Sequence, residues 1–226
     1  MATPPKEHRA HTTYMVTKRT MYRFFFLKAL GLGGLVENIL LYTLGYFLQK
    51  HELLLHGYVF MWNHFHISLT DLSGKKPKFF EAYNNVTARA INRLLGRRGP
   101  IWDKESPNYL ECVEKADIVD KAAYALANPV LAGLCRSRHA WNGAISSDHL
   151  LGGKVLRVKK PRIFFSRRMP DFVEIRLSPP PGFETLEAWR VAVTEAADAK
   201  EEEARRERAR SGRRFPTKKE LARVPR

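Results

Sequence analysis

Residues 57–70 read GYVFMWNHFHISLT, and the second half of this stretch alternates strictly between polar and apolar side chains. Such period-two alternation is typical of a strand with one buried face. The polar face would carry His64, His66, Ser68 and Thr70. Two histidines at i and i+2 of a strand project side by side, so His64 and His66 could share one divalent cation. On spacing alone, such a pair is more often ordinary polar surface than a metal site.

The composition indicates a basic protein with enough apolar residues for a packed core. The chain has 226 residues, of which 44% are hydrophobic, and its formal net charge is +16. A charge surplus of this size attracts polyanions, of which nucleic acid is the first candidate and an anionic membrane the second. The 13 Phe, 8 Tyr and 4 Trp residues could supply stacking surfaces as well as core.

Neither the cysteines nor the apolar segments indicate secretion or a membrane span. Cys112 and Cys135 form no motif, which fits a reducing cytoplasm. The N-terminal residues are polar and contain no apolar signal-peptide core. The apolar stretch 24–48 is interrupted by Lys28, Glu37 and Asn38, so it predicts a buried helix. We therefore expect a cytoplasmic protein that has no membrane partner.

Local patterns predict an alternation of strands and helices along the chain. Residues 1–10 are expected to be disordered, and 12–19 to form a first strand. Helices are predicted at 35–51, 79–95, 115–127 and 184–212. A short turn at His56–Gly57 is expected before the His-x-His strand. The third helix should end at Asn128–Pro129, because proline cannot continue a helix.

Basic residues without nearby acids form three groups that could contact phosphates. The expected nucleic-acid-binding residues are Lys18, Arg19, Arg23, Arg89, Arg93, Arg97, Arg98, Lys159, Lys160 and Arg162. Around the last group, Phe164 and Phe165 lie among the basic residues of 154–168, which suits a nucleic-acid contact, although a packed basic strand would look the same. Solvent-exposed helix or strand surfaces would show the same pattern.

The alanine-rich segment 115–127 carries a polar stripe whose members recur at helical spacing. The stripe consists of Asp117, Lys121, Tyr124 and Asn128. Judged by pattern alone, Tyr124 could be a packed aromatic residue and Asn128 a helix C-cap before proline.

Three segments together resemble the single-tyrosine HUH transposases, and most closely the REP-associated tyrosine transposases. The segments are VFMWNHFHISL at 59–69, GRRGPIW at 96–102 and YALANPVLAGL at 124–134. Their order and separation also match, and the resemblance covers residues 11–150. It implies a catalytic domain over 11–150 and leaves 151–226 as a basic C-terminal extension with the helix at 184–212.

The resemblance implies an α+β fold of the ferredoxin-like or RRM-like kind, an antiparallel sheet with helices on one face. It implies a metal-dependent enzyme that cuts and rejoins single-stranded DNA next to hairpins through a 5′-phosphotyrosine. Matched residue by residue, His64 and His66 are the HUH ligands, Tyr124 is the nucleophile, and Asn128 completes the metal site. Mixed nitrogen and oxygen ligands suit Mg²⁺ or Mn²⁺. A bacterial protein bound to the nucleoid, either monomer or homodimer, fits this activity.

The sequence also departs from the family pattern. Trp62 stands where the family has proline, and DKESP at 103–107 replaces a segment that could contact DNA. A nucleic-acid-binding protein that kept the scaffold but lost cutting is therefore the main alternative. A membrane-surface protein ranks last, because the charged C-terminal helix has no sustained apolar face.

Overall fold

The computed structural model describes residues 9–28, 32 and 34–226, so eight of the ten N-terminal residues expected to be disordered lie outside the described residues. The strands are β1 (Thr12–Arg19), β2 (Leu53–Phe60), β3 (His64–Asp71), β4 (Asn108–Glu111), β5 (Leu156–Lys159) and β6 (Phe172–Ile175). The α-helices are α1 (Leu35–Leu48), α2 (Lys76–Leu94), α3 (Lys115–Leu131), α4 (Asp148–Leu151), α5 (Leu186–Arg210) and α6 (Lys218–Arg223). Two 3₁₀ turns are η1 (Met21–Arg23) and η2 (Arg138–Ala140).

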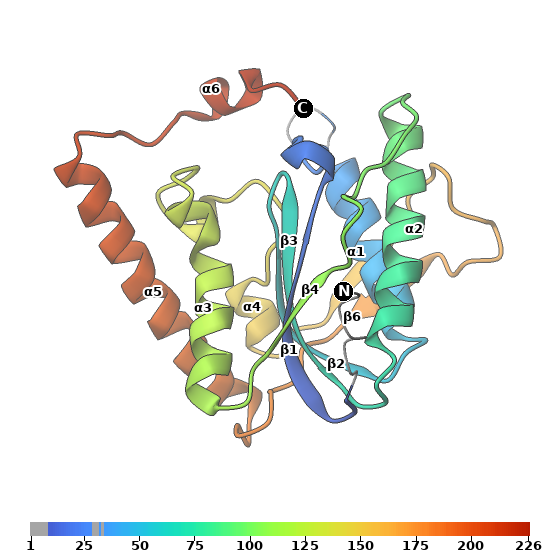
Figure 1. The fold of residues 1–226 in the computed structure, drawn as a ribbon, viewed down its shortest axis with the longest axis horizontal. Coiled ribbons are helices and arrows are strands. Elements are labelled where there is room, and N and C mark those ends of the chain that lie inside the picture. Colours follow the sequence, from blue (N-terminus) through green and yellow to red (C-terminus); the bar gives the residue numbers. More distant parts are fainter. Residues whose placement is uncertain (1–8, 29–31, 33) are drawn as a thin grey trace, which may run out of the picture.

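The central sheet has four antiparallel strands in the order β2-β3-β1-β4 (Figure 1). This confirms the predicted α+β fold with an antiparallel sheet. In β3, Phe65 faces α2, where its ring lies 6.0 Å from that of Phe80 and 5.9 Å from that of Tyr83. Helix α1 packs beside α2 on this face.

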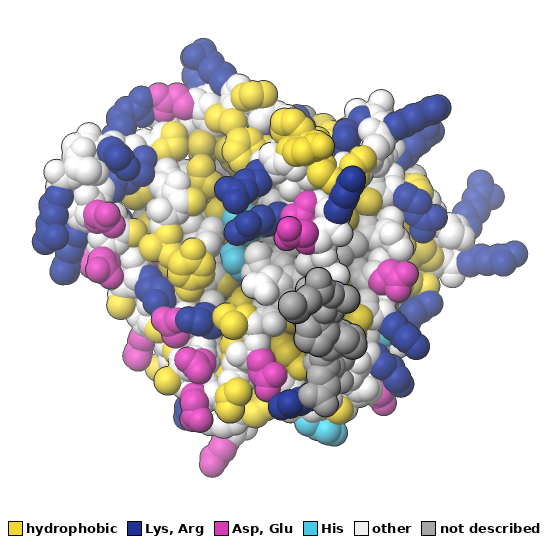
Figure 2. Space-filling model, in the orientation of Figure 1, with side chains coloured by type: hydrophobic (Ala, Val, Ile, Leu, Met, Phe, Trp, Pro, Cys, Tyr) yellow, Lys and Arg dark blue, Asp and Glu magenta, His cyan; other side chains and the backbone are white. Residues whose placement is uncertain are grey.

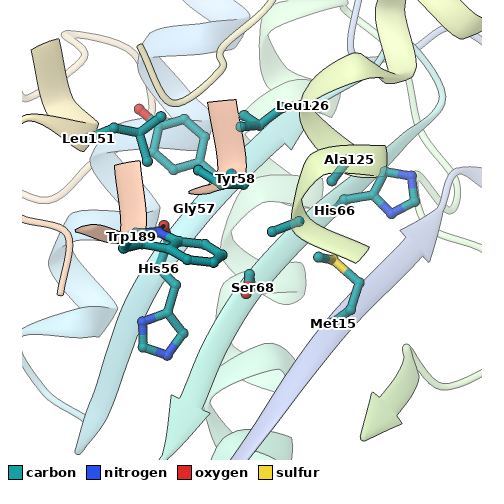
Figure 3. A pocket seen from close by; sticks show the side chains of 12 residues that line it. Met15, His56, Gly57, Tyr58, His66, Ser68, Ala125, Leu126, Leu151 and Trp189 are labelled. Carbon is teal, nitrogen blue, oxygen red and sulfur yellow. Dashed lines mark hydrogen bonds between the residues drawn. The ribbon is translucent and has the colours of Figure 1, made fainter. Parts of the chain in front are cut away.

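Helix α3 packs against the opposite face, which the expectation of helices on one face did not include. Its small or apolar residues Ile118, Ala122 and Leu126 are buried. Alanines let the helix approach the strands closely, and Figure 3 shows Ala125 and Leu126 above Met15, His66 and Ser68 of the sheet. The space left between them is only about 10 Å³, so this contact is packed core and holds no ligand.

Two local predictions were wrong. The turn expected at His56–Gly57 lies inside β2, where the pairing with β3 shifts register between Leu55 and Gly57. This shift is a β-bulge, a feature that glycine in a strand often marks. Helix α3 does not end at Asn128–Pro129 but continues to Leu131 and terminates before Gly133, whose φ is 69°. Asn128 is therefore inside the helix and is not its C-cap.

The segment expected as a basic extension packs onto the rest of the fold. Strands β5 and β6 pair with each other and lie against α1, while α5 runs along α3 (Figure 1). Trp189 of α5 is 1% exposed, and its Nε1 donates to the His56 carbonyl at 3.1 Å. His56 itself is buried and contacts Ser178 of the extension through Nδ1 at 2.8 Å. The bulge in β2 is thus one of the places where the extension is attached to the rest of the fold.

Within the described part of the chain, no helix is long and apolar enough to cross a membrane. Cys112 and Cys135 are both buried and are not joined in a disulfide.

Candidate active site

His64 and His66 lie at the start of β3 on the face that α3 covers. Their ring centroids are 4.9 Å apart and their planes are nearly perpendicular. In the sheet register, His64 lies opposite Arg19 and His66 opposite Thr17 of β1. The predicted side-by-side projection of the two imidazoles is therefore present.

Each imidazole is oriented by a hydrogen bond through its Nδ1. The Nδ1 of His64 lies 2.7 Å from Asn63 Oδ1, and the Asn63 Nδ2 donates to the Arg23 carbonyl. Since Asn63 Oδ1 can only accept, His64 carries its proton on Nδ1 and presents the Nε2 lone pair. The Nδ1 of His66 lies 2.8 Å from Thr17 Oγ1. Metal-binding histidines commonly have such a partner on the second ring nitrogen.

Burial keeps both imidazoles neutral. It lowers the pKa of His64 to about 4, helped by the positive charges of Arg19 and Arg23 and opposed by a hydrogen bond with the Asn128 side chain. Burial, the neighbouring His64 and Arg19 lower the pKa of His66 to about 3. Neutral imidazole is the form that binds metal ions.

Helix α3 brings Tyr124 and Asn128 to the histidines. The Tyr124 and His66 ring centroids are 6.2 Å apart, and Tyr124 is 47% exposed. Asn128, one turn later, is buried and lines the same cavity of about 370 Å³. The structure thus brings together all four residues expected at the catalytic centre, namely His64, His66, Tyr124 and Asn128.

The donor set fits a weakly held divalent cation. The Nε2 of His66 is buried and has no hydrogen-bond partner among the described residues. Over the same residues, no cluster of three or more His, Cys, Asp or Glu side chains could hold a metal. A metal here would therefore have two imidazoles and the Asn128 amide oxygen as protein ligands, leaving further positions for phosphate oxygens or water. Such oxygen-completed sites suit Mg²⁺ or Mn²⁺.

Two other tyrosines that could act as nucleophiles lie on the face of the sheet that α2 covers, opposite the histidines. Tyr83 belongs to α2, is fully buried and stacks on Phe79. Tyr109 of β4 packs against Phe80 on the same α2 face. Burial raises the pKa of both phenols. Neither ring lines the cavity that contains the two histidines.

Of the first group of predicted basic residues, Lys18, Arg19 and Arg23, only the two arginines line the cavity. Arg19 and Arg23 are exposed and line the cavity with the histidines. Lys18 is buried, and its ammonium donates to the Asp103 carboxylate and carbonyl, both at 3.0 Å. Lys18 therefore stabilises the DKESP segment and is poorly placed to reach a phosphate.

The other basic residues lie away from the catalytic cavity. Arg97 donates to Asn92 Oδ1 and lies over the Phe26 ring, whereas Arg93 and Arg98 are exposed. Arg89 lies over Phe164, in the loop between β5 and β6. Lys159 and Arg162, near that loop, are exposed, and Lys160 is paired with Asp171 at 2.9 Å. Nucleic-acid binding by these residues stays a prediction.

Sequence reasoning missed Thr17 and Asn63, which orient the two imidazoles. Asn63 directly precedes His64, so its position next to the motif was a usable signal. Thr17 is 49 residues from His66, and only the β1–β3 register brings them together.

One solved structure matches this fold, a REP-associated tyrosine transposase bound to a REP hairpin. The TM-score is 0.55 at 13% sequence identity, and the match covers 67% of this chain and 86% of that chain. The similarity shows a shared fold. No family model matches the sequence, and no curated protein matches it.

Proposed function

We propose that this protein is a metal-dependent single-strand DNA endonuclease and strand transferase that acts at DNA hairpins with Tyr124 as its nucleophile. The observation that carries the proposal is the convergence of an exposed tyrosine, two neutral histidines and an amide in one cavity. The shared fold with a hairpin-bound transposase supports DNA as the substrate. The formal charge of +16 supports a polyanionic substrate in general.

In the proposed reaction, the Tyr124 oxygen attacks the phosphorus of a phosphodiester held next to His64 and His66. A Tyr–O–P bond forms and the P–O3′ bond breaks, leaving a 5′-phosphotyrosine and a free 3′ end. The phenol loses a proton and the departing 3′ oxygen takes one up. One P–O bond replaces another, so the reaction consumes no cofactor. The covalent intermediate retains the energy of the original bond, and a new 3′-hydroxyl can reverse the step to join strands.

The protein's own residues would position the reacting groups. Helix α3 is packed against the sheet, so Tyr124 approaches the histidines from a rigid element. The guanidinium groups of Arg19 and Arg23 line the cavity and can bind the phosphate chain. Mg²⁺ or Mn²⁺, bound by His64, His66 and Asn128, would polarise the phosphate and offset its developing charge.

The proposal is tested by incubating the protein and labelled single-stranded hairpin DNAs with Mn²⁺ and separating the products on a denaturing gel. Wild type should give a covalent protein–DNA adduct, and Tyr124→Phe should give none. Stability should hardly change, because the substitution removes one oxygen from a half-exposed side chain. If wild type binds the hairpins tightly but forms no adduct, the protein is a DNA-binding protein on this scaffold and the proposal is wrong.

A further inference from the structure

Two exposed aromatic rings flank Arg23, a residue that lines the catalytic cavity. Tyr22 in η1 is 81% exposed and Phe24, just after it, is 49% exposed. Their ring centroids are 6.0 Å apart, in an edge-to-face arrangement. Phe24 continues to Phe26 at 5.5 Å, and the Arg97 guanidinium lies 4.2 Å from the Phe26 ring centre. These contacts form a continuous row of side chains from η1 to the residues just after α2.

This segment is held in a conformation that is unfavourable for its residues. Tyr22 and Arg23 have φ values of 52° and 57°, the left-handed region that L side chains rarely adopt. Two such residues in succession persist only where surrounding contacts impose them. Here the buried Thr20 does so, because its Oγ1 donates to the Phe24 carbonyl at 2.6 Å and lies 3.1 Å from the Asn63 carbonyl, with which the same proton can be shared.

Two further hydrogen bonds, made by the Asn63 side chain, connect this segment to the catalytic site. Asn63, which accepts from His64, also donates to the carbonyl of Arg23, the residue between the two rings. Arg23 in turn lines the cavity that contains both histidines and Tyr124. Hydrophobic surface over the η1 region lies beside Lys, Arg and His side chains in Figure 2. A strand that left the cavity on the Arg23 side would therefore reach these rings.

We propose that Tyr22 and Phe24 form a stacking site for unpaired bases of single-stranded DNA adjacent to the cleaved phosphate. The inference rests on the proposed function, since it places that phosphate in the His64–His66 cavity. Aromatic rings that alternate with arginines bind single strands, because every base offers a π face while its backbone is anionic. A protein partner fits less well, because Arg23 stands between the two rings and Arg97 lies over the neighbouring Phe26 ring, which adds positive charge to the apolar surface. The rigid backbone presents both rings without an ordering cost on binding.

The test compares two oligonucleotides of equal length and charge, a single-stranded thymidine oligomer and its abasic counterpart. Affinities are measured by fluorescence anisotropy in EDTA for the full chain, so that no cutting occurs. Tyr22→Asn removes the ring and keeps a residue that tolerates the left-handed conformation. It should weaken thymidine binding roughly five- to 150-fold, the factor that one stacked base contributes, and leave abasic binding unchanged. Tyr22→Phe should bind like wild type, as should Val113→Asn, which changes another exposed apolar side chain.

The inference is overturned if Tyr22→Asn binds both oligomers as wild type does, or if wild type does not prefer thymidine to abasic DNA. It is also overturned if Tyr22→Asn weakens binding to both oligomers equally, because the loss would then not depend on a base. These results are separate from adduct formation. A thymidine preference that depends on Tyr22, together with no adduct from any hairpin, would refute the catalytic proposal and leave the stacking site. Loss of the adduct in Tyr22→Phe would instead make Tyr22 a nucleophile and refute the role proposed here.

Discussion

Truncation of Trp189 should show that the C-terminal extension is an integral part of the fold. Its indole is 1% exposed, lies 5.2 Å from the Phe183 ring, and donates to the His56 carbonyl in the bulge of β2. Replacing a buried tryptophan with alanine typically costs about 3–5 kcal/mol, and the carbonyl left without a donor adds about 1 kcal/mol. The whole free energy of unfolding of a protein domain is roughly 5–15 kcal/mol. We therefore expect Trp189→Ala to unfold much of the protein or to bring it close to unfolding.

Urea unfolding followed by circular dichroism measures this effect. Trp189→Phe keeps most of the packing and loses the hydrogen bond, so it should cost about 1–2 kcal/mol. Val191→Ala is a matched control on an exposed position of the same helix and should change stability by less than about 0.5 kcal/mol. A loss below about 1 kcal/mol in Trp189→Ala would mean that α5 is a dispensable tail and that α3 is held by the sheet alone.

Three further predictions concern protons, metal and charge. Burial lowers the pKa of His56 to about 4 from its ordinary value of 6.5, so between these pH values only the unfolded chain binds the extra proton and stability falls as pH falls. His56→Gln should make the fall in unfolding free energy shallower by up to about 1.4 kcal/mol per pH unit, and equal slopes would show that His56 does not titrate this way. EDTA should abolish adduct formation and Mn²⁺ restore it, while His64→Ala combined with His66→Ala should prevent the restoration; normal cutting by this double variant would place the metal elsewhere. Arg19→Ala and Arg23→Ala should each reduce the log–log salt dependence of single-strand binding by about 0.7, whereas Arg176→Ala, exposed just after β6, should leave it unchanged. An unchanged slope in the first two variants would exclude phosphate contacts in the cavity.

Much of the sheet could be predicted because its local patterns are strong. The predicted strand 12–19 agrees with β1, and the alternation after His64 agrees with β3. Strand β2 was missed because LLLHGYVF is almost continuously apolar and contains a bulge at His56, just before its glycine. The passage of α3 through Pro129 was missed for a different reason. Burial of the Val130 side chain stabilises the last turn by more than the hydrogen bond that proline cannot make. This burial depends on residues from other parts of the fold, so no local pattern shows it.

The catalytic candidates depended on the resemblance, since neither His-x-His nor a tyrosine in an alanine-rich helix identifies a site by itself. Their meeting in one cavity required the packing of α3 on the sheet, which no local pattern encodes. The attachment of α5 was partly visible, because Trp189, Val193 and Ala197 recur every four residues. The sequence did not show that this apolar face of α5 packs against α3. The buried ion pair between Arg138 and Glu201 at 3.2 Å joins residues far apart in sequence.

The site of covalent attachment tests the central claim most directly. Wild-type protein is incubated with hairpin DNA and Mn²⁺, the adduct is digested with nuclease and protease, and the peptide that carries a nucleotide is sequenced by mass spectrometry. We expect a 5′-phosphate linked to the oxygen of Tyr124. Attachment to Tyr22, Tyr109 or any residue outside α3, or a 3′-phosphate linkage, would contradict this claim.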